Sequence, residues 1–219
     1  MSPVQTIETE GTETLVDWFQ RNSRYVSIGA GVVVVAALGF WFYGRSTQIK
    51  RLNAERGLNQ AKQSLAAGNA ALATTDLQRV ATRYKGTASG AQAAMLLAQV
   101  SYQQGKFAEG VQALQPYDSE GAAGESLPAI LSLIGDGQAS QGKLDEAVAT
   151  YRRATEAAEL PGPKALYMAQ AARTLMAAGK NAEAKVIWEE LARDPKAAVV
   201  QNEAAIRLGE LTAQPAGKS

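Results

Sequence analysis

The distribution of apolar and polar positions divides the chain into two parts. Residues 25–43 form one apolar run without a charged side chain, whereas apolar residues after residue 46 recur at the spacing of one helix face. Proline is absent from residues 46–67, and only Gly57 interrupts that stretch. The pattern therefore predicts an all-α chain, in which a long apolar helix runs straight into a series of amphipathic helices.

Four glycines at one spacing organise the second part. Gly68, Gly105, Gly142 and Gly179 follow one another at intervals of 37 residues. A fixed period of this size is typical of a solenoid of stacked helix pairs. Each glycine is expected in the turn between the two helices of a pair, where a left-handed backbone costs glycine little.

Other positions repeat with the same period. A small residue stands five positions after each glycine, and a large residue stands nine positions after it, which places both on one face of the second helix: Ala73, Gly110, Ala147 and Ala184, then Leu77, Leu114, Tyr151 and Trp188. Eight and seven positions before the glycines stand Leu97-Ala98, Ile134-Gly135 and Ala171-Ala172. The register continues to Leu208-Gly209, which predicts a lone first helix that caps the stack.

The repeat predicts the positions of the helices. We expect a helix from Asn69 to about Lys85, then 88–104 paired with 107–117, 127–141 with 144–159, 163–178 with 181–193, and a capping helix over 196–212. Residues 118–126 are rich in Gly, Ser, Asp and Glu, which predicts a flexible loop.

This spacing resembles the tetratricopeptide repeat, whose consensus places a Leu-Gly pair, a turn glycine, an alanine and an aromatic residue at these offsets. The usual period is about 34, so a period of 37 implies slightly longer helices or linkers. The first repeat departs from the pattern, because Gln60-Ala61 replaces Leu-Gly. The expected fold is a single transmembrane helix followed by a tetratricopeptide-like helical-hairpin solenoid of about four pairs and a capping helix.

The apolar run has the length of a membrane anchor. Its 19 residues are enough to cross about 30 Å of hydrocarbon as a helix. A cleaved signal peptide is the main alternative, but the preceding leader is long and acidic, unlike the short basic start of such peptides. We expect aromatic side chains at both membrane interfaces: Trp18 and Tyr25, then Trp41, Phe42 and Tyr43.

These features predict five segments. They are an acidic leader over 1–24 with a short interfacial helix from Thr12 to Asn22, the transmembrane helix 25–43, a helical linker 44–53, the repeat domain 54–213 and a disordered tail 214–219. The excess of Lys and Arg after the anchor favours repeats in the cytoplasm, but long domains translocate largely regardless of charge. The charge count alone therefore leaves the orientation open.

The composition gives no sign of catalysis. The chain has no His and no Cys, which excludes thiol nucleophiles, imidazole acid–base chemistry and Cys/His metal sites. No phosphate-binding glycine loop is present, and the carboxylates are dispersed. A net charge of +1 argues against nucleic acid as a partner. We therefore expect protein partners, and no cofactor, metal or small-molecule substrate.

The register also predicts a binding surface. In tetratricopeptide arrays the first helices line the concave face, which here gives Leu58, Lys62, Leu65, Gln92, Met95, Gln99, Tyr102, Gln103, Ser132, Asp136, Leu166, Arg173 and Met176. Exposed Met and Tyr would suit adaptable recognition of apolar segments. The alternative is that several of these side chains pack against neighbouring repeats.

The order of parts resembles the bacterial YfgM-like family of ancillary subunits of the Sec translocon. The resemblance is carried by the leader 13–22, the anchor end Gly39-Phe40-Trp41-Phe42-Tyr43, the Gly-Lys turns and the late segment 184–189. It implies a bacterial inner-membrane protein with a cytoplasmic N-terminus and a periplasmic repeat domain. It also implies contacts with the translocon and with periplasmic chaperones that receive secreted chains, and no catalytic residues.

Two functional hypotheses follow. The first is a membrane-tethered adaptor associated with the translocon. The second is a structural scaffold, either an assembly factor or an accessory subunit of another membrane complex. The basic residues after the anchor depart from the arrangement that the resemblance implies. The orientation of the chain in the membrane therefore stays open.

Overall fold

The computed structural model describes residues 23–213, and every regular element among them is helical. Residues 1–22 of the expected leader, with its interfacial helix and Trp18, and the tail 214–219 lie outside the described residues. The chain divides into two compact units between Ile49 and Lys50, and each is described by itself.

The first unit consists of the N-terminal part of α2, a helix that extends over Ser23–Ala66. Its continuity confirms that the apolar helix runs directly into the first repeat helix. Large apolar side chains of this unit face solvent, with Val35 exposed to 70% and Phe40 to 82%. Within the described residues, one stretch, Gly31–Ala66 of α2, is long and apolar enough to cross a membrane by length and composition.

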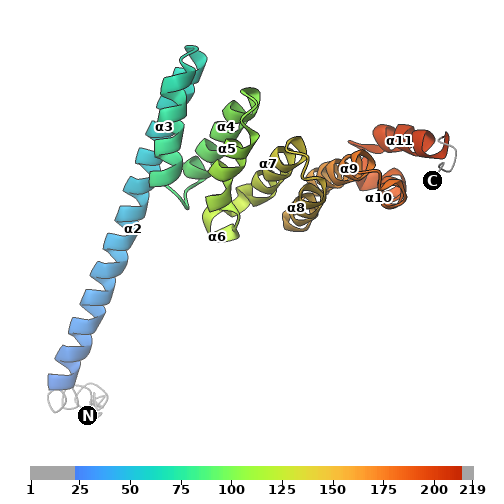
Figure 1. Cartoon of the computed structure of the whole chain (residues 1–219). Helices are drawn as coiled ribbons and strands as arrows, with labels where there is room; N and C mark the ends of the chain where they lie inside the picture. Colours follow the sequence, from blue (N-terminus) through green and yellow to red (C-terminus); the bar gives the residue numbers. More distant parts are fainter. Residues whose placement is uncertain (1–22, 214–219) are drawn as a thin grey trace, which may run out of the picture. The chain divides into compact units, whose positions relative to one another are not determined.

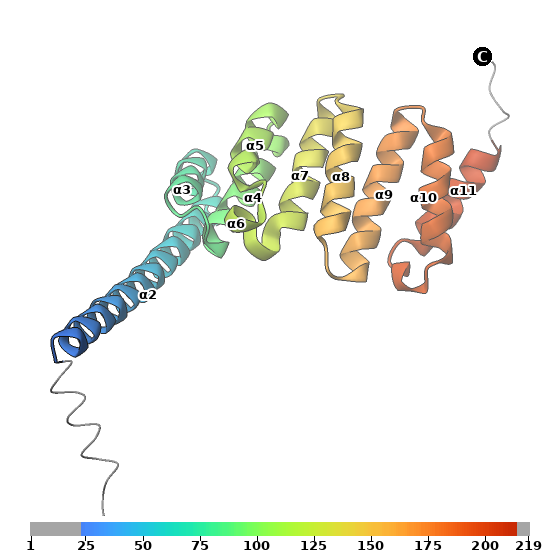
Figure 2. The ribbon, with the colours of Figure 1, turned by 90° about the horizontal axis from the view of Figure 1, so that it is seen from below.

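The second unit is a row of helices in which each packs against the next along the chain (Figures 1 and 2). After α2 come α3 Ala70–Arg83, α4 Ala88–Gln103, α5 Phe107–Leu114, η1 Gln115–Tyr117, α6 Glu120–Ala123, η2 Gly124–Ser126, α7 Leu127–Ser140, α8 Leu144–Ala157, α9 Pro161–Ala177, α10 Asn181–Arg193, η3 Pro195–Ala197 and α11 Gln201–Ala213. The fold is therefore the predicted tetratricopeptide-like solenoid of helical hairpins.

The four periodic glycines occupy the turns within the helix pairs, as predicted. Their φ angles lie between 73° and 77°, a conformation that other residues adopt only with strain. After Gly105, the Lys106 amide donates to the Ser101 carbonyl at 2.8 Å, so the turn satisfies a carbonyl at the end of α4. At the first turn, Asn69 caps α3 by accepting a hydrogen bond from the Leu72 amide at 3.1 Å.

The repeated small and large residues form the core. Ala147 and Ala184 are fully buried, and Tyr151 and Trp188 are at most 3% exposed. A Cβ atom added at Gly135 would lie 2.6 Å from the Tyr151 ring, so the missing side chain is what lets α7 and α8 approach closely. The small and large residues that recur with the period in the sequence are therefore the residues that pack between the helices.

The segment 118–126 differs from its prediction. It contains α6 and η2 rather than a flexible loop, because Ala122 and Ala123 are buried against the core at 7% and 5% exposure. The preceding helix α5 also ends three residues early, at Leu114, where η1 begins with Pro116 in its first turn. Tyr117 then anchors this linker by donating a hydrogen bond to the Ala81 carbonyl at 2.5 Å.

The last helix begins later than predicted. Residues 195–197 form η3, and Asp194 caps this turn by accepting a hydrogen bond from the Lys196 amide at 2.9 Å. The buried side chains of Ala197 and Val200 hold the connection to α11. Helix α11 packs on α10 through its own buried residue Ala204 and caps the described part of the stack.

Candidate functional site

The predicted first-helix surface is partly open to solvent. Six of its predicted residues are exposed: Lys62, Gln92, Gln99, Gln103, Leu166 and Arg173. Five of these are polar, and Leu166 is 42% exposed. All of them except Arg173, which pairs with Glu203, remain available for a partner, and the prediction that they bind one stays a prediction.

Other predicted residues of this surface serve packing. Leu58 is 3% exposed within the core, and Leu65 and Met95 are half-buried against the same cluster. The indole N–H of Trp188 lies 3.3 Å from the Met176 sulfur. For these four residues, the structure agrees with the alternative that they stabilise the repeats.

Tyr102 is a bridge between repeats. Its hydroxyl donates to the Leu133 carbonyl at 2.8 Å, and its ring lies 5.7 Å from that of Phe107. The ring fills the space beside Gly110 and Gly137, where a side chain would collide with it. Burial, and secondarily the charge of Asp136, raises the pKa of Tyr102, so the hydroxyl stays protonated and can donate.

Asp136 and Ser132 belong to a polar network between α7, α8 and α9. The Asp136 carboxylate accepts from the Tyr151 hydroxyl at 2.7 Å and from the Gln170 amide at 3.2 Å. The Gln170 carbonyl in turn accepts from the Ser132 hydroxyl at 2.8 Å. Burial raises the pKa of Asp136, and the Tyr151 bond and the Arg173 charge oppose that effect. Burial, followed by the Asp136 charge, also raises the pKa of Tyr151.

The network continues to α11 through an ion pair. The Arg173 guanidinium donates to both carboxylate oxygens of Glu203, at 2.6 and 2.7 Å. This bidentate pair raises the pKa of Arg173 and lowers that of Glu203. The sequence placed Asp136 and Arg173 on one surface, but their bonding partners are other parts of the protein.

The predicted aromatic residues of the apolar helix are exposed where their side chains are described. Tyr25, Trp41 and Phe42 are exposed to 76%, 62% and 70%. The Arg45 guanidinium lies 5.9 Å from the centroid of the Trp41 ring, within the range of a cation–π contact. The side chain of Tyr43 is outside what the structure describes.

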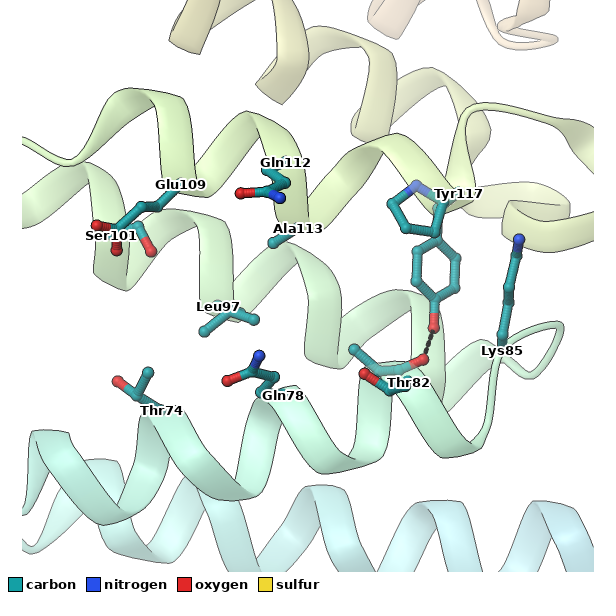
Figure 3. A pocket seen from close by; sticks show the side chains of 12 residues that line it. Thr74, Gln78, Thr82, Lys85, Leu97, Ser101, Glu109, Gln112, Ala113 and Tyr117 are labelled. Atoms are coloured by element: carbon teal, nitrogen blue, oxygen red, sulfur yellow. Dashed lines mark hydrogen bonds between the residues drawn. The ribbon is translucent and has the colours of Figure 1, made fainter.

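A groove between the second helices was missed by sequence reasoning. It encloses about 430 Å³ between α3, α4 and the α5–η1 segment (Figure 3). Leu97 and Ala113 contribute apolar surface, Thr74, Gln78 and Gln112 contribute polar groups, and Tyr117 closes one end. Pro116 is the signal that could have revealed it, since a proline ends a helix early and a shorter second helix leaves surface uncovered.

The described residues include no group of three or more Asp, Glu, His or Cys side chains that could hold a metal ion. The surfaces described above offer hydrogen-bonding groups and modest apolar area, which suits contact with a polypeptide.

The geometry defines a helical-hairpin repeat domain of the kind used for protein–protein interaction, and no enzyme family is indicated. The chain belongs to the tetratricopeptide repeat-like domain family, whose matches cover residues 17–134 and 61–168. The first match begins before the apolar run and extends through the first half of the repeats.

Solved structures show the same fold. The nearly identical TPR-like repeats of a Podosopora anserina protein described as a kinesin light chain superpose with a TM-score of 0.52 at 17% identity, covering 74% of this chain and 94% of that one. A glutamine-to-methionine variant of those repeats gives a TM-score of 0.53 at 18% identity, covering 74% and 93%. No curated protein matches this chain. At such identities the likeness concerns the fold alone.

Proposed function

We propose that this chain is a non-catalytic, membrane-tethered adaptor that binds other proteins. One observation carries the proposal: a single match to the repeat-like family, over residues 17–134, takes in both the apolar run and the early repeats. This match supports a link between the apolar helix and the repeats. The apolar side chains of this helix are exposed rather than packed against other residues of the first unit, which supports insertion into lipid.

For the partners, we propose the Sec translocon in a bacterial inner membrane, with periplasmic chaperones receiving secreted chains from it. The support is the resemblance of the anchor and Gly-Lys turns to the YfgM-like family, together with a repeat fold that binds proteins. Exposed glutamines on the first helices, such as Gln92 and Gln99, are available for such contacts.

We further propose a cytoplasmic N-terminus and periplasmic repeats. The resemblance to the YfgM-like family supports this orientation, and the length of the repeat domain removes the objection from the flanking charges, since long domains translocate largely regardless of charge. A reporter enzyme fused after Ser219 tests it: activity of a periplasm-only reporter is expected. Activity of a cytoplasm-only reporter at the same position would reverse the orientation.

Site-specific crosslinking in native membranes tests the partner. A photoreactive residue at Gln99 is expected to recover translocon subunits, whereas one at Glu156, an exposed position on α8, serves as the control. Recovery of a different stoichiometric complex from Gln99 would instead support the scaffold function. That alternative is favoured by the internal bonding of Asp136 and Arg173, which leaves fewer first-helix groups free for a transient partner.

A further inference from the structure

A second cleft lies between the two linkers that join successive helix pairs. It has a volume of about 650 Å³ and is lined by parts of α6, η2, the start of α7, the end of α8 and the start of α9. These segments lie along one edge of the row of helices (Figure 2). The volume is within the range of sites that hold a few side chains of a ligand.

The charges that line this cleft are all negative. Glu120, Glu125 and Glu159 are exposed there, and the lining contains no Lys or Arg. Two acidic residues near other linkers or turns are paired: Asp118 bonds Arg153 at 2.5 and 3.2 Å, and Asp145 pairs with Lys180 at 2.7 Å. None of the three glutamates takes part in an ion pair within the described residues.

The same cleft has an apolar wall. Leu160 is 66% exposed, and Leu127, Pro128, Pro163 and Tyr167 extend the wall. Pro128 and Pro163 stand in the first turns of α7 and α9, where their fixed backbone suits the start of a helix. The wall is therefore formed by helix ends of defined geometry.

We propose that this cleft binds a segment of a partner protein in which Lys or Arg residues flank a large apolar side chain. Three carboxylates that form no ion pair among the described residues attract the basic residues, and the wall around Leu160 covers the apolar one. The inference rests on the proposed protein-binding function and adds the chemistry of the bound segment. It also places that segment on the linker edge rather than on the first-helix surface.

Binding of labelled peptides to the full chain in nanodiscs tests the proposal. The probe is a dye-labelled nonapeptide with lysines on both sides of a leucine pair, and its counterpart carries glutamate in place of each lysine. Fluorescence anisotropy is expected to show the lysine peptide binding at least about tenfold more tightly, with an affinity that falls as salt is raised.

Paired variants locate the site. The double variant Glu125→Gln/Glu159→Gln is expected to bind the lysine peptide about tenfold more weakly, because two attractive charges are removed. Glu55→Gln with Glu146→Gln removes two other exposed carboxylates outside the cleft and is expected to leave the affinity unchanged. Leu160→Ser should also weaken binding of the lysine peptide. The circular dichroism spectrum of this variant should match that of the parent protein, because the Leu160 side chain is exposed.

Equal affinity for the two peptides, or an unchanged affinity in the Glu125/Glu159 variant, would overturn the cleft proposal. The crosslinking experiment separates this failure from failure of the adaptor function. If Gln99 still recovers the same partner in the Glu125/Glu159 variant while the peptide does not bind, the adaptor function stands and the cleft is excluded.

Discussion

Two glycines at the same repeat position have opposite surroundings. Gly135 in α7 is buried against the Tyr151 ring of the following helix. Gly209 holds the equivalent place in α11, yet it is exposed, and a Cβ atom built there meets no other atom within 4 Å. Both positions carry glycine because they are equivalent in the 37-residue repeat. A side chain is sterically excluded only at Gly135, where a second helix packs over the position.

Alanine substitutions at these glycines should therefore have opposite effects. Gly209→Ala is expected to stabilise the protein by about 0.5–1 kcal/mol, because alanine favours a helix interior. Gly135→Ala should destabilise it by about 1–3 kcal/mol through collision with Tyr151. Chemical unfolding of the fragment 46–219 measures both, and a destabilising Gly209→Ala would show that α11 is covered in solution.

Asp136 should make stability depend on pH in an unusual direction. Burial raises its pKa above the ordinary value of 3.8, so the folded protein holds the proton more strongly than the unfolded chain. Its contribution to stability is then complete below pH 3.8 and is lost as the pH rises through the raised pKa. Glu203 acts in the opposite sense, because its lowered pKa stabilises the fold above its ordinary value.

Comparison with Asp136→Asn isolates this effect. The variant keeps Glu203 and removes only the titration of Asp136, so the parent should lose stability relative to the variant as the pH rises from 3.8. Urea unfolding of both proteins across that range is the measurement. A parent that gains stability relative to the variant over the same range would contradict the assigned burial effect.

At the scale of the elements, each second helix presents one small and one large residue to the helix before it. In α8 these are Ala147 and Tyr151, which are 0% and 3% exposed. Because a solenoid repeat contacts mainly its neighbours, damage at this pair should spread first to adjacent pairs and only then through the domain.

Ala147→Leu is expected to cost about 1–3 kcal/mol by overpacking, and Tyr151→Ala about 3–5 kcal/mol by leaving a cavity. Tyr151→Ala also removes a hydrogen bond to Asp136. The exposed Glu156→Ala provides the control and should stay within about 0.5 kcal/mol of the parent. If Ala147→Leu and Glu156→Ala have equal unfolding midpoints in the fragment 46–219, the packing register is wrong.

The elements that recur with the period could be predicted from the sequence, and those that depend on one particular contact could not. Gly142 and Trp188 follow a spacing that the stack enforces, so their positions were readable. The linker 118–126 was read as flexible from its polar composition, but Ala122 and Ala123 find buried positions that composition does not reveal. The hydrogen bond from Tyr117 to the Ala81 carbonyl likewise joins two residues that are far apart in the sequence.

The candidate binding surface was predictable to the same extent. The period placed Asp136, Arg173 and Gln99 on first helices, and Gln99 is indeed exposed. What the period could not supply was side-chain pairing across repeats, such as Arg173 with Glu203. The cleft lined by Glu125 and Leu160 arises from two linkers outside the periodic pattern, which is why it was missed.

At the scale of the whole molecule, one continuous helix carries both the proposed anchor and the first repeat helix. The proposed tether requires the apolar segment to enter lipid, and Val33 and Val35 stand near its middle with exposures of 67% and 70%. The nine Val, Ile, Leu and Phe residues of 25–43 favour insertion by about 3–5 kcal/mol.

Replacing Val33 and Val35 with Arg should abolish stable insertion, since each arginine costs about 2.5–3.5 kcal/mol near the bilayer centre. Carbonate washing of membranes measures the outcome, and the variant is expected in the soluble fraction. Replacing the same residues with Leu controls for the loss of valine and should leave the protein in the pellet. Retention of the arginine variant would show that residues 25–43 are not the span.

The open face of α11 bears on how such a chain can change in length. Gly209 repeats the contact position of Gly135, so the last described helix already displays the surface on which a second helix packs elsewhere in the chain. If a unit of 37 residues were duplicated, both of its faces would pack against helix surfaces of the kind already present in the stack. If a unit were deleted, the two helices brought together would still present complementary faces. Gain or loss of whole units is thus tolerated by the packing, whereas insertion of a few residues inside a pair would displace the turn glycine from its place.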